Sequence, residues 1–139
     1  MKYKFLPHTA DAKFRAYGKN IEEAFKNAAY AMVSVITDDK IKAKVKKKIS
    51  IKSEDEKALL YDFLEQFLIL LDTKGFLLAK VNKIKIKEEK KGFSLSAEII
   101  GDNKPKNYQT KTTIKAVTYQ EMLVRKEKGR VTLQVVVDI

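Results

Sequence analysis

Two aspartates near opposite ends of the sequence are the side chains best placed for chemistry. Asp11 stands directly before a predicted strand, and Asp138 directly follows the apolar run Val135–Val137. Ile139 comes next and would bring an α-carboxylate. If the last strand ends beside the start of the second strand, these three carboxylates converge, and they repel one another unless a cation neutralises them. Carboxylate oxygens suit hard cations such as Ca²⁺ or Mg²⁺ better than Zn²⁺.

The same residues also have simpler interpretations. From spacing alone, Asp11 is favoured as a strand-start residue whose carboxylate accepts hydrogen bonds from backbone N–H groups. Asp138 could be a solvated tail residue, although the strongly apolar strand before it weakens that interpretation. His8 fits a packed or hydrogen-bonded loop histidine better than a ligand or a catalytic base. Lys115, in the segment Thr113–Tyr119, would be one more surface lysine.

Composition excludes most other kinds of active site. The sequence has no cysteine, which rules out disulfides, thiolate metal sites and cysteine nucleophiles. It has one histidine, so a multi-histidine metal site is impossible. Glycine-rich phosphate loops and the G-x-S-x-G nucleophile motif are also absent. The acidic residues therefore remain the main candidates.

The balance of charge is strongly basic. A formal net charge of +11 raises the expectation of RNA, or of a partner that carries RNA. A lysine-rich surface that serves solubility is the simpler explanation. Seven lysines lie between Lys40 and Lys52, but no aromatic residues alternate with them for base stacking. This stretch is therefore interpreted first as a half-buried strand whose solvated lysine face protects it against edge pairing.

Two amphipathic helices and a series of strands would position these residues. Asn20 is a good N-cap with Glu23 three residues on, apolar residues at helical spacing follow as far as Ile36, and the helix is expected to end near Asp38–Asp39. Ser53 and Glu56 form a capping box for a longer helix, which Gly75 ends. Alternating residues predict strands at 2–5, 12–17, 40–52, 76–87, 93–99, 111–117, 122–126 and 131–137, with a bulge between residues 81 and 84.

This order of elements predicts the fold class. Two strands, a helix, a strand and a helix precede a run of strands, which is typical of an α+β protein. We expect two layers, with both helices packed on one face of a largely antiparallel β-sheet, in a single domain over residues 1–139. Lys2, Lys4 and His8 interrupt the start, so no signal peptide is expected. No run approaches the roughly 18 apolar residues of a membrane span, and a cytoplasmic protein without membrane contact is predicted.

Four separated motifs match those of a known family. They are H-T-A-D at His8–Asp11, L-L-Y-D-F-L with a following D-T-x-G at Leu59–Leu64 and Asp72–Gly75, I-K-A-V-T-Y-x-E-M at Ile114–Met122, and V-V-D-I at Val136–Ile139. With these motifs in the same order along its whole length, the sequence resembles the archease family.

The resemblance implies a function that composition alone does not indicate. Archeases are small, chaperone-like accessory proteins for the GTP-dependent RNA ligase that joins tRNA exon halves, and they promote guanylylation and multiple turnover of that ligase. This chain is thus expected to be a non-enzymatic activator in tRNA splicing, with the ligase as its partner and tRNA met only indirectly. The resemblance also implies a divalent cation, expected to be Ca²⁺, held by Asp11, Asp138 and Ile139. It also implies that Lys115 takes part in activating the partner, and His8 is expected to share this role.

The sequence departs from the family pattern near its last motifs. Gln120 stands where many relatives carry histidine, Thr113 where an acidic residue is common, and Lys106–Asn107 where the preceding loop often has a histidine. The cation ligands are unaffected, but ligase contacts around residues 106–120 transfer less directly. Two other functions remain open: a basic RNA-binding module that acts directly on tRNA, and a metal-dependent hydrolase, which would have no obvious general base beyond His8.

Overall fold

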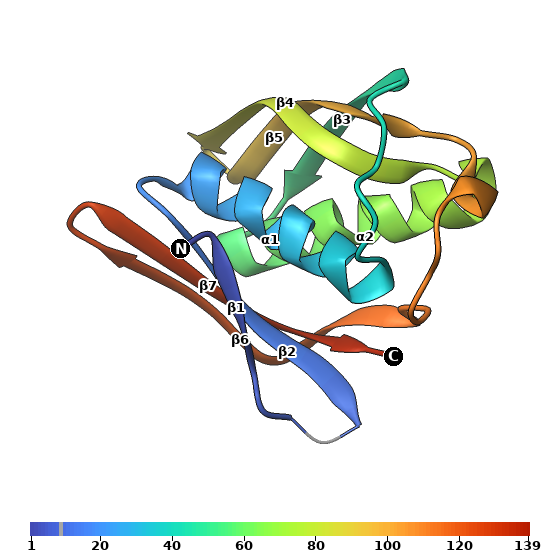
Figure 1. The fold of residues 1–139 in the computed structure, drawn as a ribbon. Helices are drawn as coiled ribbons and strands as arrows, with labels where there is room; N and C mark the ends of the chain where they lie inside the picture. The colour runs from blue at the N-terminus through green and yellow to red at the C-terminus, as the bar shows by residue number, and fades with distance from the viewer. Residues whose placement is uncertain (9) are drawn as a thin grey trace.

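The computed structural model describes residues 1–8 and 10–139, which form seven strands, two long helices and one short 3-10 helix. Figure 1 shows the helices as a middle layer with strands on both sides. In chain order the elements are β1 (Tyr3–Leu6), β2 (Asp11–Gly18), α1 (Ile21–Ile36), β3 (Val45–Ser53), α2 (Glu56–Lys74), β4 (Leu77–Glu89), β5 (Gly92–Asp102), η1 (Pro105–Asn107), β6 (Ala116–Glu127) and β7 (Arg130–Asp138).

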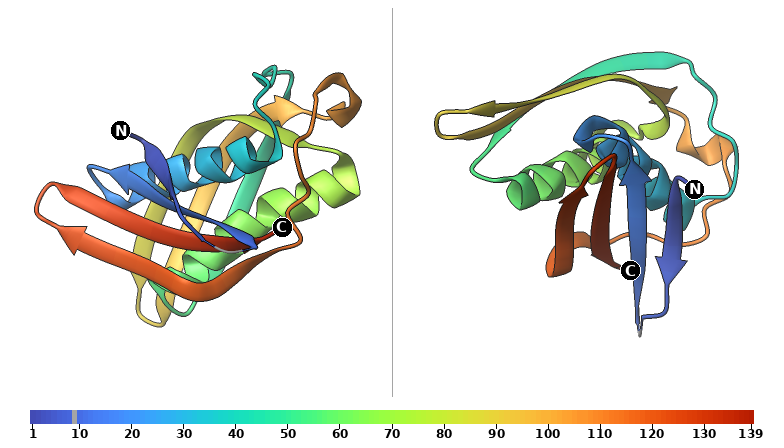
Figure 2. Two further views of the ribbon diagram at one scale, coloured as in Figure 1. Left: turned by 60° about the horizontal axis from the view of Figure 1, so that its bottom comes forward. Right: turned by 90° about the vertical axis from the view of Figure 1, so that its left-hand side faces the viewer.

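The strands form two antiparallel sheets. The first sheet has the order β1-β2-β7-β6, and the second has the order β3-β5-β4. The α+β class with antiparallel strands is thus confirmed, and each sheet has the helices on one of its faces (Figures 1 and 2). The strands divide between two sheets instead of forming one, and the connection 103–115 carries the chain from the second sheet past the helices to β6.

Helix α1 begins where its sequence predicts and ends at Ile36, shortly before the predicted end near Asp38–Asp39. The Asn20 side chain accepts a hydrogen bond from the Glu23 N–H at 2.9 Å, and the Glu23 carboxylate accepts one from the Lys19 N–H at 2.9 Å. These bonds satisfy N–H groups that the first turn would leave without partners. Small residues such as Ala24, Ala28 and Ala31 are fully buried, so α1 can pack closely against its neighbours.

The predicted end of helix α2 is confirmed, but its predicted N-cap is wrong. The predicted N-cap, Ser53, is wrong, because Ser53 is still the last residue of β3 and its hydroxyl donates to Asp62 at 2.6 Å. Asp55 caps the helix instead, and its carboxylate accepts from the Ala58 N–H at 2.8 Å. Gly75 ends the helix as predicted, with a φ of 64° and its N–H directed at the carbonyls of Leu70 and Leu71.

The hydrophobic core joins all three layers. Phe14 from the first sheet, Phe25 from α1 and Phe63 from α2 are fully buried, and Leu95 and Ile99 contribute from the second sheet. This continuous core fixes the two sheets relative to the helices and therefore fixes the ends of β2 and β7. In the described part of the chain, neither helix is long and apolar enough to cross a membrane.

Two strands carry irregularities. The predicted bulge in β4 is confirmed by register shifts between Leu78 and Lys80 and between Val81 and Lys83. The strands predicted at 111–117 and 122–126 prove to be one strand, β6, which begins only at Ala116. Residues 119–122 of β6 stand opposite a single residue of β7, because Thr118 pairs with Val136 and Leu123 already pairs with Gln134.

Candidate cation site

The antiparallel pairing of β2 with β7 brings the two predicted aspartates together. Asp11 is the first residue of β2, Asp138 is the last residue of β7, and the two stand directly opposite each other. Directly opposed residues of an antiparallel pair project to the same face of the sheet, with Cα atoms roughly 4.5–5.5 Å apart. In β2 the neighbours Ala12 and Phe14 face the core, so both aspartates lie on the outer face of the first sheet.

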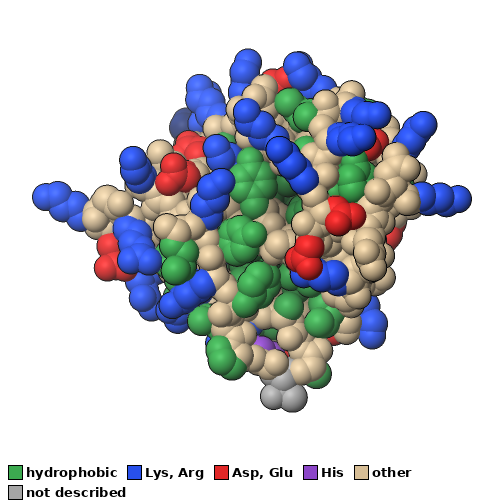
Figure 3. Space-filling view, viewed as in Figure 1, with side chains coloured by type: hydrophobic (Ala, Val, Ile, Leu, Met, Phe, Trp, Pro, Cys, Tyr) green, Lys and Arg blue, Asp and Glu red, His purple; other side chains and the backbone are tan. Residues whose placement is uncertain are grey.

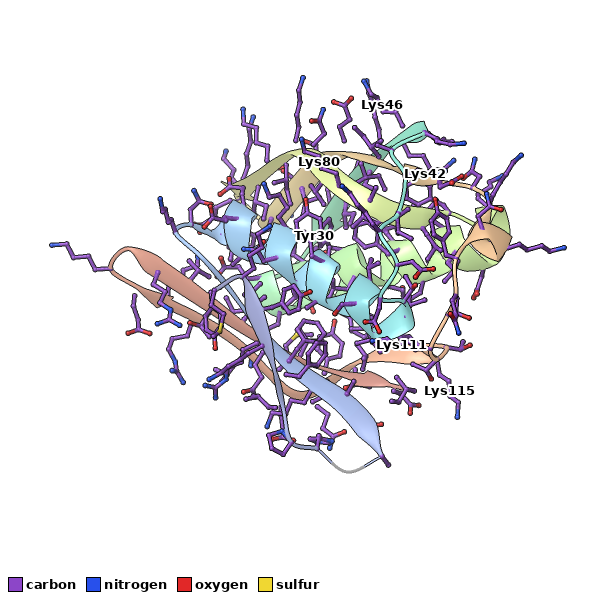
Figure 4. All side chains as sticks on the ribbon, viewed as in Figure 1. Tyr30, Lys42, Lys46, Lys80, Lys111 and Lys115 are labelled. Atoms are coloured by element: carbon purple, nitrogen blue, oxygen red, sulfur yellow. The ribbon has the colours of Figure 1, made fainter. Side chains whose placement is uncertain are left out.

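The start of β6 meets Asp138 from its other side. Ala116 is the partner of Asp138 in β6, and the Lys115 N–H donates to the Asp138 carbonyl at 2.7 Å. Lys115 therefore lies just outside the strand, and its side chain is exposed. Figure 4 shows Lys115 at the same end of the first sheet as the C-terminal residues. The structure thus brings Lys115 beside the predicted cation ligands.

Ile139 extends the site by one residue. It follows Asp138 directly, is half-buried, and its side chain packs against the hydrophobic core. This packing holds the backbone of Ile139 next to the pair of aspartates. The third predicted ligand, a carboxylate on Ile139, would therefore be offered from an anchored residue.

His8 lies between two carboxylates. Its Nε2 is 3.0 Å from Oε2 of Glu121, and its Nδ1 is 3.7 Å from Oδ2 of Asp11. The His8 side chain is 15% exposed, and among the described residues its buried Nδ1 has no hydrogen-bond partner. His8 is thus part of the same cluster, as a link between Asp11 and Glu121.

Glu121 is a member of the cluster that the sequence analysis did not single out. It belongs to the inserted residues of β6 and has a φ of 52°, a left-handed conformation that costs energy for a residue other than glycine. Gln134 of β7 holds this segment in place by donating to the Glu121 carbonyl at 2.8 Å. The only available signal was the Glu in the motif Ile114–Met122, together with the break in alternation around it.

Lys13 and His8 both form hydrogen bonds with the Glu121 carboxylate. The Lys13 Nζ is 3.0 Å from Oε1 of Glu121, and this hydrogen bond, followed by that from His8, holds the pKa of Glu121 below its usual value. Glu121 is therefore a paired carboxylate that orients His8. Asp11 and Asp138 remain as the carboxylates of the cluster that face each other across the strands.

The remaining donors fit a hard cation. Like charges directly opposite each other in a sheet are destabilising, and a cation between Asp11 and Asp138 would remove this repulsion. Within residues 1–8 and 10–139, no three His, Cys, Asp or Glu side chains are grouped so that they could hold a metal. A third protein ligand would thus come from the backbone, where Ile139 lies. Oxygen donors alone favour Ca²⁺ or Mg²⁺ over softer metals.

The comparison with known proteins assigns the family. The sequence model of the Archease protein family (MTH1598/TM1083) matches residues 3–139 of this chain. This chain belongs to the archease family. Among its relatives, the "Protein archease" of Methanosarcina mazei is 39% identical over 140 residues, which cover 99% of this chain and 96% of the relative. The "Protein archease" of Pyrococcus abyssi is 36% identical, with 99% of both chains covered.

Solved archease-family structures have the same fold. The solution structure of protein 1598 from Methanobacterium thermoautotrophicum is 37% identical and superposes with a TM-score of 0.86 over 99% of both chains. A crystal structure from Thermotoga maritima, described as an archease and possible chaperone, gives a TM-score of 0.64 at 20% identity over 98% of this chain and 96% of that one. The second likeness concerns the fold alone.

Proposed function

We propose that this archease is a non-enzymatic accessory protein that activates a GTP-dependent tRNA-splicing RNA ligase. It would promote guanylylation of the ligase and its multiple turnover, in the cytoplasm, with tRNA as the substrate of that partner. Family membership supports the general role. The pairing of Asp11 with Asp138 is the observation that carries the proposal, because it creates a half-buried acidic pair at the ends of the two inner strands of a sheet in a basic protein.

Asp11, Asp138 and the Ile139 carboxylate would hold a divalent cation, with Ca²⁺ the expected ion. When bound, the ion supplies a fixed positive charge that can stabilise phosphate oxygens at a partner's nucleotide site. The protein positions these ligands through the β2–β7 pairing and the burial of the Ile139 side chain. His8, oriented by Glu121, lies beside Asp11 on the same face.

Lys115 would contact the partner directly. Its backbone N–H donates to the Asp138 carbonyl, whereas its side chain is exposed to solvent. An exposed ammonium group beside a cation site suits a docking contact with a carboxylate or phosphate of the ligase. Backbone and side chain of Lys115 therefore have separable roles.

A reconstituted guanylylation assay tests the proposal. The cognate ligase, GTP and a divalent metal are incubated with and without this protein, and both the ligase–GMP adduct and the joined RNA are measured. We expect substoichiometric protein to raise guanylylation and turnover at least tenfold. The variant D11N/D138N should lose this gain, because it removes both side-chain ligands of the cation.

A charge-matched control distinguishes the loss of the cation ligands from a general loss of negative charge. The variant E88Q/E127Q removes two negative charges at exposed positions away from the ligand pair and should activate the ligase like the wild type. Calcium calorimetry on the same proteins gives a readout that does not depend on the ligase. If the wild type yields no gain in guanylylation or turnover at any ratio of the two proteins, the proposed function is refuted.

A further inference from the structure

The outer face of the second sheet carries two rows of lysines. Lys46, Lys48 and Lys52 of β3 and Lys83, Lys85 and Lys87 of β4 are all exposed there, and Ser94, Ser96 and Glu98 of β5 lie between them. We call this surface the lysine face. In Figure 3 lysine and arginine side chains crowd the upper edge of the molecule, and Figure 4 shows Lys46 directed away from the helices.

Strand pairing sets the rows in register. Glu98 stands between Lys48 and Lys83, and two positions further along this face Ser94 stands between Lys52 and Lys87. Two strand spacings separate the rows by about 10 Å, and the successive lysines of β4 are about 7 Å apart, whereas Ser50 takes the place of a lysine in the β3 row. The lysine face is thus a double row of cations with short side chains between the rows.

A groove runs between the two rows. Its polar lining is Lys48 and Ser50 on one side, Lys83 and Lys85 on the other, and Ser96 and Glu98 at its base, and three apolar residues of the same strands complete the lining. The serines leave space above the central strand and offer hydroxyl donors. A chain of phosphates laid in this groove would have ammonium groups on both flanks and hydroxyl groups below.

Most of these lysines form no ion pair within residues 1–8 and 10–139. Among the described residues, Lys46 at 2.8 Å and Lys83 at 4.0 Å both pair with Glu98, while Lys48, Lys52, Lys85 and Lys87 have no such pair. Lysines on both edge strands would also discourage edge-to-edge pairing. That purpose does not require the central strand to place Ser94, Ser96 and Glu98 between the two rows.

The composition of the lysine face decides what kind of anion it fits. The one aromatic residue of the three strands, Phe93, packs against the core, so no ring is available for base stacking. The exposed large hydrophobic residues are Met1, Phe5, Ile69 and Tyr119, none of which belongs to β3, β4 or β5. Membrane surfaces are bound through buried apolar side chains as well as charge. A polyphosphate backbone matches the lysine face better than a lipid surface.

We propose that the lysine face binds the sugar–phosphate backbone of RNA without regard to sequence. It lies across the helical layer from the cation site, which is built on the first sheet (Figure 1). The protein could therefore hold RNA and a protein partner at the same time. This inference does not rest on the proposed function, because the binding needs only this protein and RNA.

Two variants with equal charge test the inference. K48Q/K52Q/K85Q/K87Q removes four lysines of the lysine face, and K4Q/K19Q/K57Q/K128Q removes four exposed lysines elsewhere. Binding of fluorescein-labelled single-stranded and duplex RNAs of unrelated sequence is measured by anisotropy from 50 to 300 mM KCl. We expect at least tenfold weaker binding for the first variant and less than threefold for the second. Each lost phosphate contact lowers the slope of log affinity against log salt by about 0.7–0.9, so that slope should fall by about 3.

The substitution Glu98→Gln gives an effect of the opposite sign. It removes the one carboxylate of the lysine face and releases Lys46 and Lys83, so RNA binding should tighten at least threefold. Equal losses of RNA affinity in the two quadruple variants would overturn the inference, as would weaker RNA binding by E98Q. Lysine-dependent binding of phosphatidylserine vesicles without RNA binding would also overturn it. Thermal unfolding of every variant shows whether each is folded, and E98Q keeps the test valid if a quadruple variant is not.

Discussion

Glu121 of β6 contacts Lys13 of β2 at 3.0 Å, although β7 lies between these two strands. The contact is possible because residues 119–122 are inserted opposite one residue of β7 and pass over its outer face. Gln134 of β7 is 5% exposed under this segment and donates to the Glu121 carbonyl. The inserted residues thus tie three strands together at the candidate cation site.

The substitution Glu121→Gln should change how stability depends on pH. The folded-state pKa of Glu121 is lowered by its hydrogen bonds from Lys13 and His8. A lowered folded pKa means that the ionised carboxylate stabilises the fold above its unfolded pKa of about 4.3 and that this contribution is lost as pH falls through the folded pKa. We expect the melting temperatures of the two proteins to differ by a few degrees at pH 7 and to converge well below pH 4.3.

Glu98 and Asp102 also have lowered pKa values, so the wild-type curve alone cannot isolate Glu121. The informative quantity is the difference between wild type and E121Q at each pH, measured by calorimetry. The variant E127Q, which changes an exposed carboxylate of the same strand, serves as the control. A difference for E121Q that stays constant from pH 7 to pH 3 would contradict the role given to this ion pair.

Several parts of the site could be predicted from the sequence because they depend on strand ends. Asp11 and Asp138 directly flank apolar alternation, so pairing of the two strands was enough to bring them together. Glu121 could not be found in this way. Its side chain reaches β2 from an inserted segment in which the Glu121 backbone is left-handed, and no alternation pattern encodes either feature.

In the fold as well, features set by local sequence could be predicted, whereas features set by the pairing of distant strands could not. The caps at Asn20 and Gly75 rest on local chemistry and were predictable. The separation into two sheets depends on which distant strands pair, and apolar alternation does not specify the partner of a strand. The lysine face is a further case, since alternation shows that Lys48 and Lys85 are exposed, whereas only the pairing with β5 places them on one face.

Neutralising Asp138 should affect stability in opposite directions with and without metal. In EDTA, Asp138→Asn removes the repulsion between opposed carboxylates and should stabilise the fold by about 0.5 kcal/mol, within the range for cross-strand pairs. In Ca²⁺ the wild type should gain stability that the variant lacks, by about 2.7 kcal/mol when the free ion is at 100 times its dissociation constant. Thermal unfolding in EDTA and in CaCl₂ measures both effects. Equal responses of the two proteins to Ca²⁺ would argue against a site at Asp138.

Phe63 should be a main contributor to the stability of the helical layer. Its side chain is fully buried, and its ring lies 5.7 Å from that of Phe25 in α1 and 5.0 Å from that of Phe67. Phe63→Ala should lower the free energy of unfolding by about 3–5 kcal/mol, which urea denaturation can measure. Ile69→Ala on the same helix is the control, since Ile69 is 44% exposed and its loss should cost less than about 1 kcal/mol. Similar losses in the free energy of unfolding at the two positions would mean that α2 packs through a different face.

The two roles assigned to Lys115 can be separated by two substitutions. Lys115→Ala keeps the backbone N–H that donates to the Asp138 carbonyl at 2.7 Å, so Ca²⁺ affinity should be unchanged within about twofold while ligase activation falls at least tenfold. Lys115→Pro removes that N–H and should weaken Ca²⁺ binding as well, because the end of β7 loses a tether next to its ligand. Calcium calorimetry and the guanylylation assay on both variants, with Lys111→Ala as a matched surface control, distinguish the two effects. If K115A lost Ca²⁺ affinity as strongly as K115P, the lysine side chain would belong to the cation site and not to the contact with the ligase.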